Sequence, residues 1–148
     1  MTQKEAILLA SDHAAFELKE IVGRHLRARG FEVEDLGTQG RESVDYTVYG
    51  KALAGRISRG EAKRGILLCG TGQGMCMVAN RFSRVRAALC NDLFSAEMSR
   101  RHNNANILVL GGRIVGDALA LAIVETWLAT SFEGGRHQDR LDQFNEGL

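Results

Sequence analysis

The segment of the sequence best suited to chemistry is a glycine-rich run, Cys-Gly-Thr-Gly-Gln-Gly, at positions 69–74. Glycines at alternate positions let the backbone turn sharply and present consecutive N–H groups, and a predicted helix begins just after them, near Met75. Such a loop binds anions. Cys69 could act there as a base, because donors at a helix N-terminus favour the thiolate. The alternative for Cys69 is a buried cysteine without a chemical role, which is the interpretation given to Cys76 and Cys90.

Three well-known loops do not fit these residues. A dinucleotide-binding fingerprint needs G-x-G-x-x-G after the first strand, whereas this G-x-G-x-G follows the third predicted strand. A P-loop needs Gly-Lys-Ser/Thr, and Met75 with Cys76 stand in that place. A phosphatase-like Cys-x5-Arg loop needs arginine where this chain has Met75. The segment therefore indicates an anion-binding loop of another kind.

Polar residues also gather at three other places. Asp12 and His13 follow the first apolar run, with a helix cap and a surface histidine as the alternative. Arg113 follows the fifth apolar run, with a cap or a surface ion pair as the alternative. Arg136 and Arg140 lie at i and i+4 if their segment is helical, which weakens a helix but suits the binding of a phosphate. The alternative for these two is a pair of solvated arginines.

The histidines have separate interpretations. His102 stands in an Arg-Arg-His-Asn-Asn segment at the end of the fourth predicted helix. His25 lies on the apolar side of the first predicted helix, and we expect a structural role for it. No H-x3-H spacing occurs among the four histidines, so we expect no metal site.

Five short apolar runs are typical of buried parallel strands, because they are apolar on both faces. They occupy positions 6–10, 31–35, 65–69, 85–89 and 106–110. Segments of helical period separate them, and the clearest repeats apolar residues at i, i+3 and i+4 over 115–127. This alternation predicts an α/β fold, a three-layer α/β/α sandwich with a five-stranded parallel sheet in Rossmann-like or flavodoxin-like winding. Ligands bind at the carboxyl ends of such strands.

The composition predicts one globular domain over residues 1–148. The chain has 19 basic and 18 acidic side chains, and the net charge of +1 predicts neither a nucleic-acid nor a membrane partner. The longest apolar run, 118–124, is far below the roughly 18 residues that cross a bilayer. Three cysteines without C-x-x-C spacing are typical of a reducing compartment and predict a cytoplasmic protein. The 17 glycines and 0 prolines exclude proline-stiffened linkers.

Several ordered motifs are shared with one known family. They are Ser-Asp-His at 11–13, Leu-Gly-Thr at 36–38, Asp-Tyr at 45–46, Cys-Gly-Thr-Gly-x-Gly at 69–74, Ala-Asn at 79–80, Arg-x-His-Asn at 100–103, Gly-Gly-Arg at 111–113 and Glu-Gly-Gly-Arg-His-x-x-Arg at 133–140. On these motifs the chain resembles, over nearly its full length, the B-type ribose-5-phosphate isomerases, a family that includes galactose-6-phosphate isomerase subunits. The resemblance implies interconversion of an aldose phosphate and a ketose phosphate, without metal or organic cofactor, in a site shared by two subunits.

The resemblance also implies roles for individual residues. Cys69 corresponds to the base, and Thr71 assists at the same carbons. His102 corresponds to the acid that opens the sugar ring, with Asp12 as its partner. The implied substrate and phosphate contacts are His13, Gly70, Gly72, Gln73, Gly74, Asn103, Arg113, Arg136 and Arg140.

Two positions distinguish this chain within the family it resembles. Gln73 stands where some members have a glutamate base, so the chain resembles the members that use cysteine. Thr47 stands where the family usually has a proline after tyrosine, and the missing proline loosens the turn that carries Tyr46.

The direction of the predicted strands indicates a shared site independently of the resemblance. Cys69 lies at the carboxyl edge of the sheet, whereas the helix before the fifth strand must return His102 to the amino edge. A five-residue strand is about 17 Å long, which separates the two side chains within one subunit. We therefore predict a homodimer with shared active sites, with a tetramer as the alternative assembly, in which the segment 133–148 contacts the partner subunit.

The resemblance, with which the chemistry of the residues agrees, predicts an isomerase that interconverts ribose 5-phosphate and ribulose 5-phosphate through an enediolate. One alternative is an isomerase of a hexose 6-phosphate, such as allose or galactose 6-phosphate. The other is a sugar-phosphate-binding subunit without catalytic activity. The presence of a base, a donor loop, a ring-opening histidine and phosphate-binding arginines favours the enzyme.

Overall fold

A computed structural model describes residues 4–147 as alternating strands and helices. The strands are β1 (Ala6–Ser11), β2 (Glu32–Asp35), β3 (Arg64–Cys69), β4 (Ala87–Leu89) and β5 (Ile107–Gly111). The helices are the 3₁₀ turn η1 (His13–Ala15), α1 (Phe16–Ala28), α2 (Tyr46–Ser58), α3 (Gln73–Ala79), α4 (Leu93–Arg101), α5 (Asp117–Ala129) and α6 (Arg136–Leu141). Every predicted strand is present, although the fourth is shortened to three residues. No helix within residues 4–147 combines the length and apolar character needed to span a membrane.

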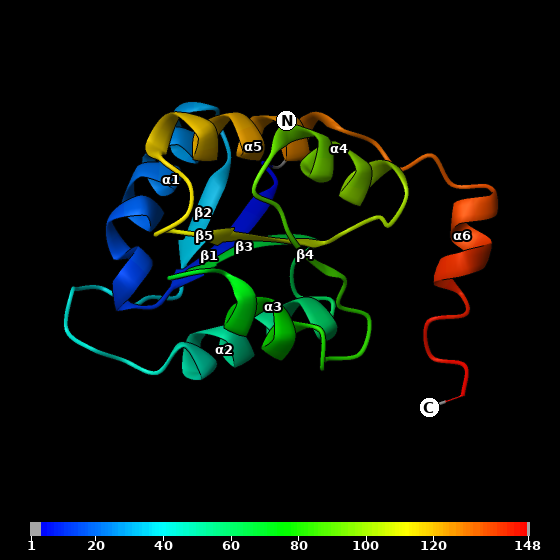
Figure 1. Ribbon diagram of the computed structural model, residues 1–148, viewed down its shortest axis with the longest axis horizontal. Helices are drawn as coiled ribbons and strands as arrows, with labels where there is room; N and C mark the ends of the chain where they lie inside the picture. The colour runs from blue at the N-terminus through cyan, green and yellow to red at the C-terminus, as the bar shows by residue number, and fades with distance from the viewer. Residues whose placement is uncertain (1–3, 148) are drawn as a thin grey trace.

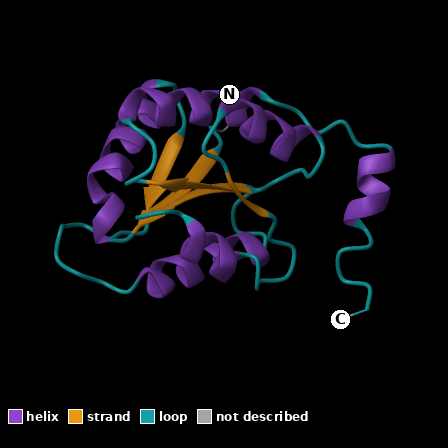
Figure 2. Ribbon diagram, viewed as in Figure 1, coloured by secondary structure: helices purple, strands orange, loops and turns teal. Residues whose placement is uncertain are grey.

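The five strands form one parallel sheet in the order β2-β1-β3-β5-β4. Helices cover both faces of the sheet, so the predicted three-layer α/β fold is confirmed (Figure 2). The order begins as in a flavodoxin-like sheet but exchanges the last two strands, since β5 lies between β3 and β4. The short strand β4 therefore forms one edge of the sheet.

The exchanged strands determine which helices share a face. Right-handed connections place the helix on opposite faces according to the direction in which the chain moves along the sheet. The chain moves one way from β2 to β3 and from β3 to β4, and α2 and α3 pack together on one face. It moves the other way from β1 to β2 and from β4 to β5, which places α1 and α4 with α5 on the opposite face (Figure 1).

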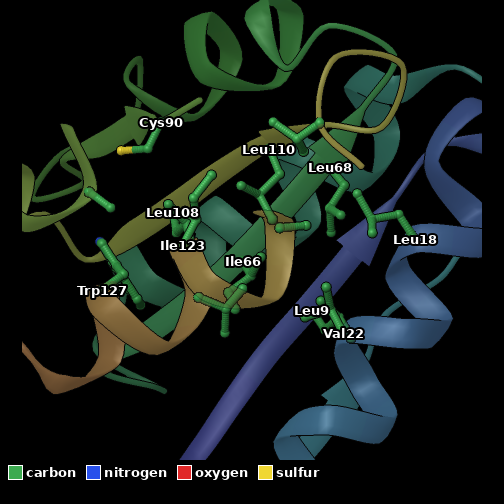
Figure 3. Packing of buried hydrophobic residues seen from close by; sticks show 14 of the residues in the cluster. Leu9, Leu18, Val22, Ile66, Leu68, Cys90, Leu108, Leu110, Ile123 and Trp127 are labelled. Atoms are coloured by element: carbon green, nitrogen blue, oxygen red, sulfur yellow. The ribbon is translucent and has the colours of Figure 1, made fainter. Parts of the chain in front are cut away.

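Two hydrophobic clusters fill the spaces on either side of the sheet. Alternating side chains of β3 enter different clusters: Ile66 and Leu68 pack under α1 and α5, whereas Leu67 and Cys69 pack under α2 and α3. Figure 3 shows the first cluster, in which Trp127 of α5 is fully buried. Because successive strand residues point to opposite faces, this alternation aims the Cys69 side chain toward the α3 side of the carboxyl edge.

The last helix is arranged differently from the others. Figure 1 shows α6 standing at the side of the molecule, away from the two layers that cover the sheet. Its approach segment is attached to the end of α4, where the backbone N–H of Glu133 donates to the carbonyl of Arg101 at 3.0 Å. The C-terminal segment therefore begins at the amino edge of the sheet, on the same side as the end of α4.

Replacing Trp127 tests the packing of the larger cluster. The Trp127 side chain is fully buried, and its Nε1–H donates to no group among the described residues. We expect Trp127→Ala to lower the free energy of unfolding by about 3–5 kcal/mol, because it leaves a cavity. Trp127→Phe keeps an aromatic ring and removes the unpaired N–H, so its cost should stay below about 1.5 kcal/mol. Urea unfolding of both variants measures the difference, and equal losses would contradict this packing.

Candidate active site

The glycine-rich loop between β3 and α3 has the conformation that its sequence predicts. Gly72 adopts a φ of +82°, in the left-handed region that favours glycine. A Cβ on Gly74 would lie 2.6 Å from the ring of Tyr46, so the absence of a side chain there lets Tyr46 rest against the loop. The helix begins at Gln73, two residues earlier than expected, and the first N–H groups of any helix lack partners within the helix. The loop therefore presents backbone donors at the carboxyl edge of the sheet.

Cys69 is the last residue of β3 and lies directly before these donors. The residue is 5% exposed, and its carbonyl accepts a hydrogen bond from the N–H of Gly112 at 2.8 Å. Burial raises the pKa of the Cys90 thiol to about 11 and also raises the pKa of Cys76. Cys69 is the candidate base among the three cysteines because it is the one that ends β3 directly before the donor loop.

Asp12 and His13 reach the same edge from β1. Asp12 Oδ1 accepts hydrogen bonds from the backbone N–H groups of Ala14 and Ala15, so the capping role considered for it is present. His13 Nδ1 accepts from the N–H of Val44 at 3.1 Å, which places the proton of the neutral ring on Nε2. Nε2 is therefore a hydrogen-bond donor, as a contact to a phosphate requires.

Arg113 adds a positive charge beside the loop. Its N–H donates to the carbonyl of Gly70 at 2.9 Å, and a Cβ on Gly70 would lie 3.4 Å from Arg113 Nη1. The guanidinium thus lies over the first glycine of the loop. An anion bound by the loop would meet both backbone donors and this charge.

A second group of predicted site residues gathers elsewhere. The rings of His102 and His137 stack with their centroids 4.2 Å apart and their planes 11° apart. His102 Nε2 lies 3.7 Å from Glu133 Oε1. Arg136 and Arg140 are both exposed on α6, beside the buried His137. Asn103 follows His102 and is also exposed.

The stacked pair bears on metal binding and on protonation. The ligating atoms of His102, Glu133 and His137 lie within 4.8 Å of one another. A metal ion must lie near the plane of each imidazole that binds it, and two nearly parallel stacked rings do not direct their lone pairs to one point. Burial, with repulsion from His102 and Arg136, lowers the pKa of His137. The neutral form of His137 is therefore favoured beside His102.

The two groups lie at opposite edges of the sheet. Gly65 pairs with Ile107 and Cys69 pairs with Gly111, so β5 starts level with the amino end of β3. The paired segment is about 13 Å long at roughly 3.3 Å per residue. His102 precedes β5 and therefore lies at or beyond the amino end of this segment. The structure thus gathers the Cys69 group and the His102 group separately and does not join them within one chain.

Several contacts at the site were not predicted from the sequence. The buried Lys19 pairs with Asp35 at 2.5 Å, and Asp35 Oδ1 also accepts from the N–H of Gly37. The Gly37 carbonyl in turn accepts from the N–H of Ser11, so this ion pair supports the strand end that carries Asp12. No local pattern identifies such a pair, because its members come from α1 and from the end of β2.

His137, Glu133 and Tyr46 were also absent from the predicted site. All three lie within motifs that the sequence shares with its family, so these motifs could have identified them as candidate site residues. Tyr46 is the first residue of α2 and follows Asp45 at the N-cap, so the helix begins at this place although Thr47 replaces the usual proline. His25 has the structural role expected of it, since its Nε2 lies 2.6 Å from Glu125 Oε1 on α5.

Comparisons with known proteins agree with this fold and loop arrangement. The sequence matches the family described as Ribose/Galactose Isomerase over residues 7–144. It is 45% identical over 136 residues to ribose-5-phosphate isomerase B of Escherichia coli, covering 92% of this chain and 91% of that protein. The structure resembles a ribose 5-phosphate isomerase from Thermotoga maritima, with a TM-score of 0.94, 53% identity and coverage of 97% and 99% of the two chains.

A third relative was solved with a sugar phosphate. Ribose-5-phosphate isomerase B of Mycoplasma genitalium, with bound ribulose-5-phosphate, has a TM-score of 0.92 and 40% identity and covers 96% of this chain and 95% of its own. Such matches along almost the whole chain define a class, the α/β isomerases of sugar phosphates. The protein belongs to the Ribose/Galactose Isomerase family.

Replacing Gly72 tests the loop conformation. Alanine at this position would adopt an unfavourable positive φ, and its Cβ would lie 2.5 Å from Leu89 Cδ1. We expect Gly72→Ala to cost at least about 1–2 kcal/mol in unfolding free energy and to lower kcat, because the donors move. Gly40→Ala is the matched control, since nothing lies within 4 Å of its Cβ and it should cost less than about 0.5 kcal/mol. Equal effects of the two substitutions would mean that the loop is not constrained at Gly72.

Proposed function

We propose that this protein is an aldose-ketose isomerase that interconverts ribose 5-phosphate and ribulose 5-phosphate. The observation that carries the proposal is Cys69 at the start of a backbone donor loop whose conformation depends on glycine. Isomerisation needs a base beside one carbon and fixed donors where negative charge develops on oxygen, and this edge supplies both. The names of the relatives from Escherichia coli and Thermotoga maritima support the substrate pair.

The reaction follows from the chemistry of the residues. The Cys69 thiolate removes the proton from C2 of the open-chain aldose, and the C–H electrons form the C1–C2 double bond while the C1 oxygen becomes an oxyanion. Amides of the loop 70–74 stabilise that oxyanion, and Thr71 assists at the same carbons. The hydroxyl proton then moves from O2 to O1, and the thiol of Cys69 returns its proton to C1 as the C2 carbonyl forms, which gives the ketose and regenerates the thiolate. No step in this sequence calls for a metal or an organic cofactor.

The second group of residues has roles in ring opening and in phosphate binding. His102 acts as the acid that opens the ring, and the ring of His137 stacked on it helps to hold its orientation. Asp12 orients the acid or the substrate from the carboxyl edge. Arg136 and Arg140 contact the phosphate, together with His13 and Arg113 from the other edge. Asn103, Gln73 and the loop glycines contact the rest of the sugar.

These roles require a homodimer with two shared sites. Cys69 of one subunit meets His102 of the partner subunit, because the two side chains of one chain lie at opposite edges of the sheet. A groove of about 810 Å³ separates the α6 segment from the edge strand β4, with Leu141 and Phe144 on one side and Ala87 and Ala88 on the other. The segment 133–148 and this groove provide a surface for the second copy. The location proposed for the enzyme is the cytoplasm, consistent with three unpaired cysteines.

Two alanine substitutions test the base and the substrate together. We expect Cys69→Ala to lower kcat for ribose 5-phosphate by about 10²–10⁴-fold, the usual contribution of a positioned acid or base. Cys90→Ala removes the same sulfur from a buried site at the end of β4, and its kcat should stay close to the wild-type value. An isomerisation assay in both directions measures these rates.

The same assay distinguishes the competing functions. Normal kcat in Cys69→Ala would show that another group is the base. A wild-type protein inactive on the pentose phosphates and active on a hexose 6-phosphate would overturn the proposed substrate. A protein that binds sugar phosphates and isomerises none of them would overturn the proposal of an enzyme.

A further inference from the structure

A cluster of basic side chains lies at the amino ends of the strands, at the opposite end of the sheet from Cys69. It surrounds a pocket of about 500 Å³ lined by Lys63, Arg64, Arg84, Arg86 and Arg100 among others. The lining contains one acidic residue, Glu5. Five cations around one carboxylate concentrate positive charge in a chain whose net charge is only +1.

The single carboxylate is used by one arginine. Glu5 accepts two hydrogen bonds from Arg64, each 2.7 Å long. Within residues 4–147, neither Arg86 nor Arg100 has a carboxylate oxygen within 4.0 Å, and both donate to neutral acceptors instead. Burial lowers the pKa of both groups, and repulsion from Arg64 and Arg86 lowers that of Arg100 further. Partly buried charges are normally compensated, and here one carboxylate offsets only part of the positive charge of five cations.

The backbone holds these arginines in place before any ligand arrives. Asn104 accepts from Arg86 Nε through its carbonyl at 3.0 Å and from Arg100 Nη1 through Oδ1 at 3.0 Å. Both Arg84 and Asn104 have positive φ angles, +66° and +46°, which non-glycine residues adopt at an energetic cost. Such strained residues cluster at sites that hold ligands. Preorganised guanidinium groups lose little side-chain entropy when they bind an anion.

We propose that this pocket binds a phosphoryl group, either of a small phosphorylated molecule or of inorganic phosphate. A guanidinium carries five N–H donors in a planar fork that matches phosphate oxygens. The bonds of Arg100 to Asn104, Ala105 and Thr130 use its Nε and Nη1, and those of Arg86 to Asn104 and Arg84 use its Nε and one Nη1 donor, so among the described residues the Nη2 donors of both have no partner. Lys63 and Arg84 are exposed at the rim and supply further charge. Phosphate alone fills a small part of 500 Å³, so an organic portion has room as well.

The pocket is adjacent in the chain to part of the proposed active site. Asn104 follows His102 and Asn103 in the chain and contacts both Arg86 and Arg100. An occupant of the pocket would therefore bind next to the segment that carries the ring-opening histidine. The binding itself does not depend on the isomerase proposal, because none of the pocket's cations has a role in the reaction.

Calorimetric titration with pyrophosphate and with orthophosphate tests the site. The experiment uses a background with Arg136→Ala and Arg140→Ala, which removes the arginines of α6 from the measurement. We expect binding to persist in that background and to weaken at least about tenfold on adding Lys63→Gln and Arg84→Gln, which remove two rim charges but none of the hydrogen bonds that hold the loop. Lys51→Gln with Arg24→Gln removes two exposed charges from α2 and α1 and should change affinity less than about twofold.

Three results of these titrations would overturn the proposed site. Unchanged binding in the Lys63→Gln, Arg84→Gln protein, or loss of all binding in the α6 background alone, would overturn the site. An equal loss in the Lys51→Gln, Arg24→Gln control would also overturn it, because the effect would then be general charge. Adding glycerol 3-phosphate identifies the source: a phosphate ester that binds more tightly than orthophosphate points to a phosphorylated molecule, and the reverse order points to inorganic phosphate.

Discussion

The parallel pairing of β3 with β5 is the constraint on which the rest of the molecule depends. It aligns Cys69 with Gly111, and the next hydrogen bond, from the N–H of Gly112 to the Cys69 carbonyl, brings the two glycine-containing strand ends together. Because β5 runs parallel to its neighbour β4, the chain must return along α4 before it enters β5. That return carries His102 to the amino edge. One hydrogen-bonded register thus assembles the donor loop and also separates it from His102.

Much of this arrangement can be predicted from the sequence, because it depends on local patterns. The apolar runs identify all five strands, and the alternating glycines identify the loop after β3. The separation of Cys69 and His102 follows from strand direction alone. The strand order cannot be predicted in this way. The exchange of β4 and β5 depends on which helices pack together, and these are α4 with α5 on one face and α2 with α3 on the other. A local sequence pattern does not indicate which helices pack together.

The unpredicted contacts share the same physical origin. The stacking of His102 on His137 joins the end of α4 to the start of α6, and the pair of Lys19 with Asp35 joins α1 to the end of β2. Each contact requires two segments whose relative position is fixed only by the tertiary fold. Tyr46 could not be placed from its turn, since the absence of a side chain at Gly74 is what lets its ring approach. Local sequence patterns therefore predict the segments, and tertiary packing determines which of their side chains meet.

The most direct test of a site shared by two subunits is complementation between two inactive variants. Cys69→Ala and His102→Ala are mixed, unfolded and refolded together at equal concentrations, and the isomerase activity is compared with that of each variant alone. In a shared site, one of the two sites in each mixed dimer has both wild-type residues, so the mixture should recover about a quarter of the wild-type activity. A mixture no more active than its components, with mixed dimers present, would contradict the account.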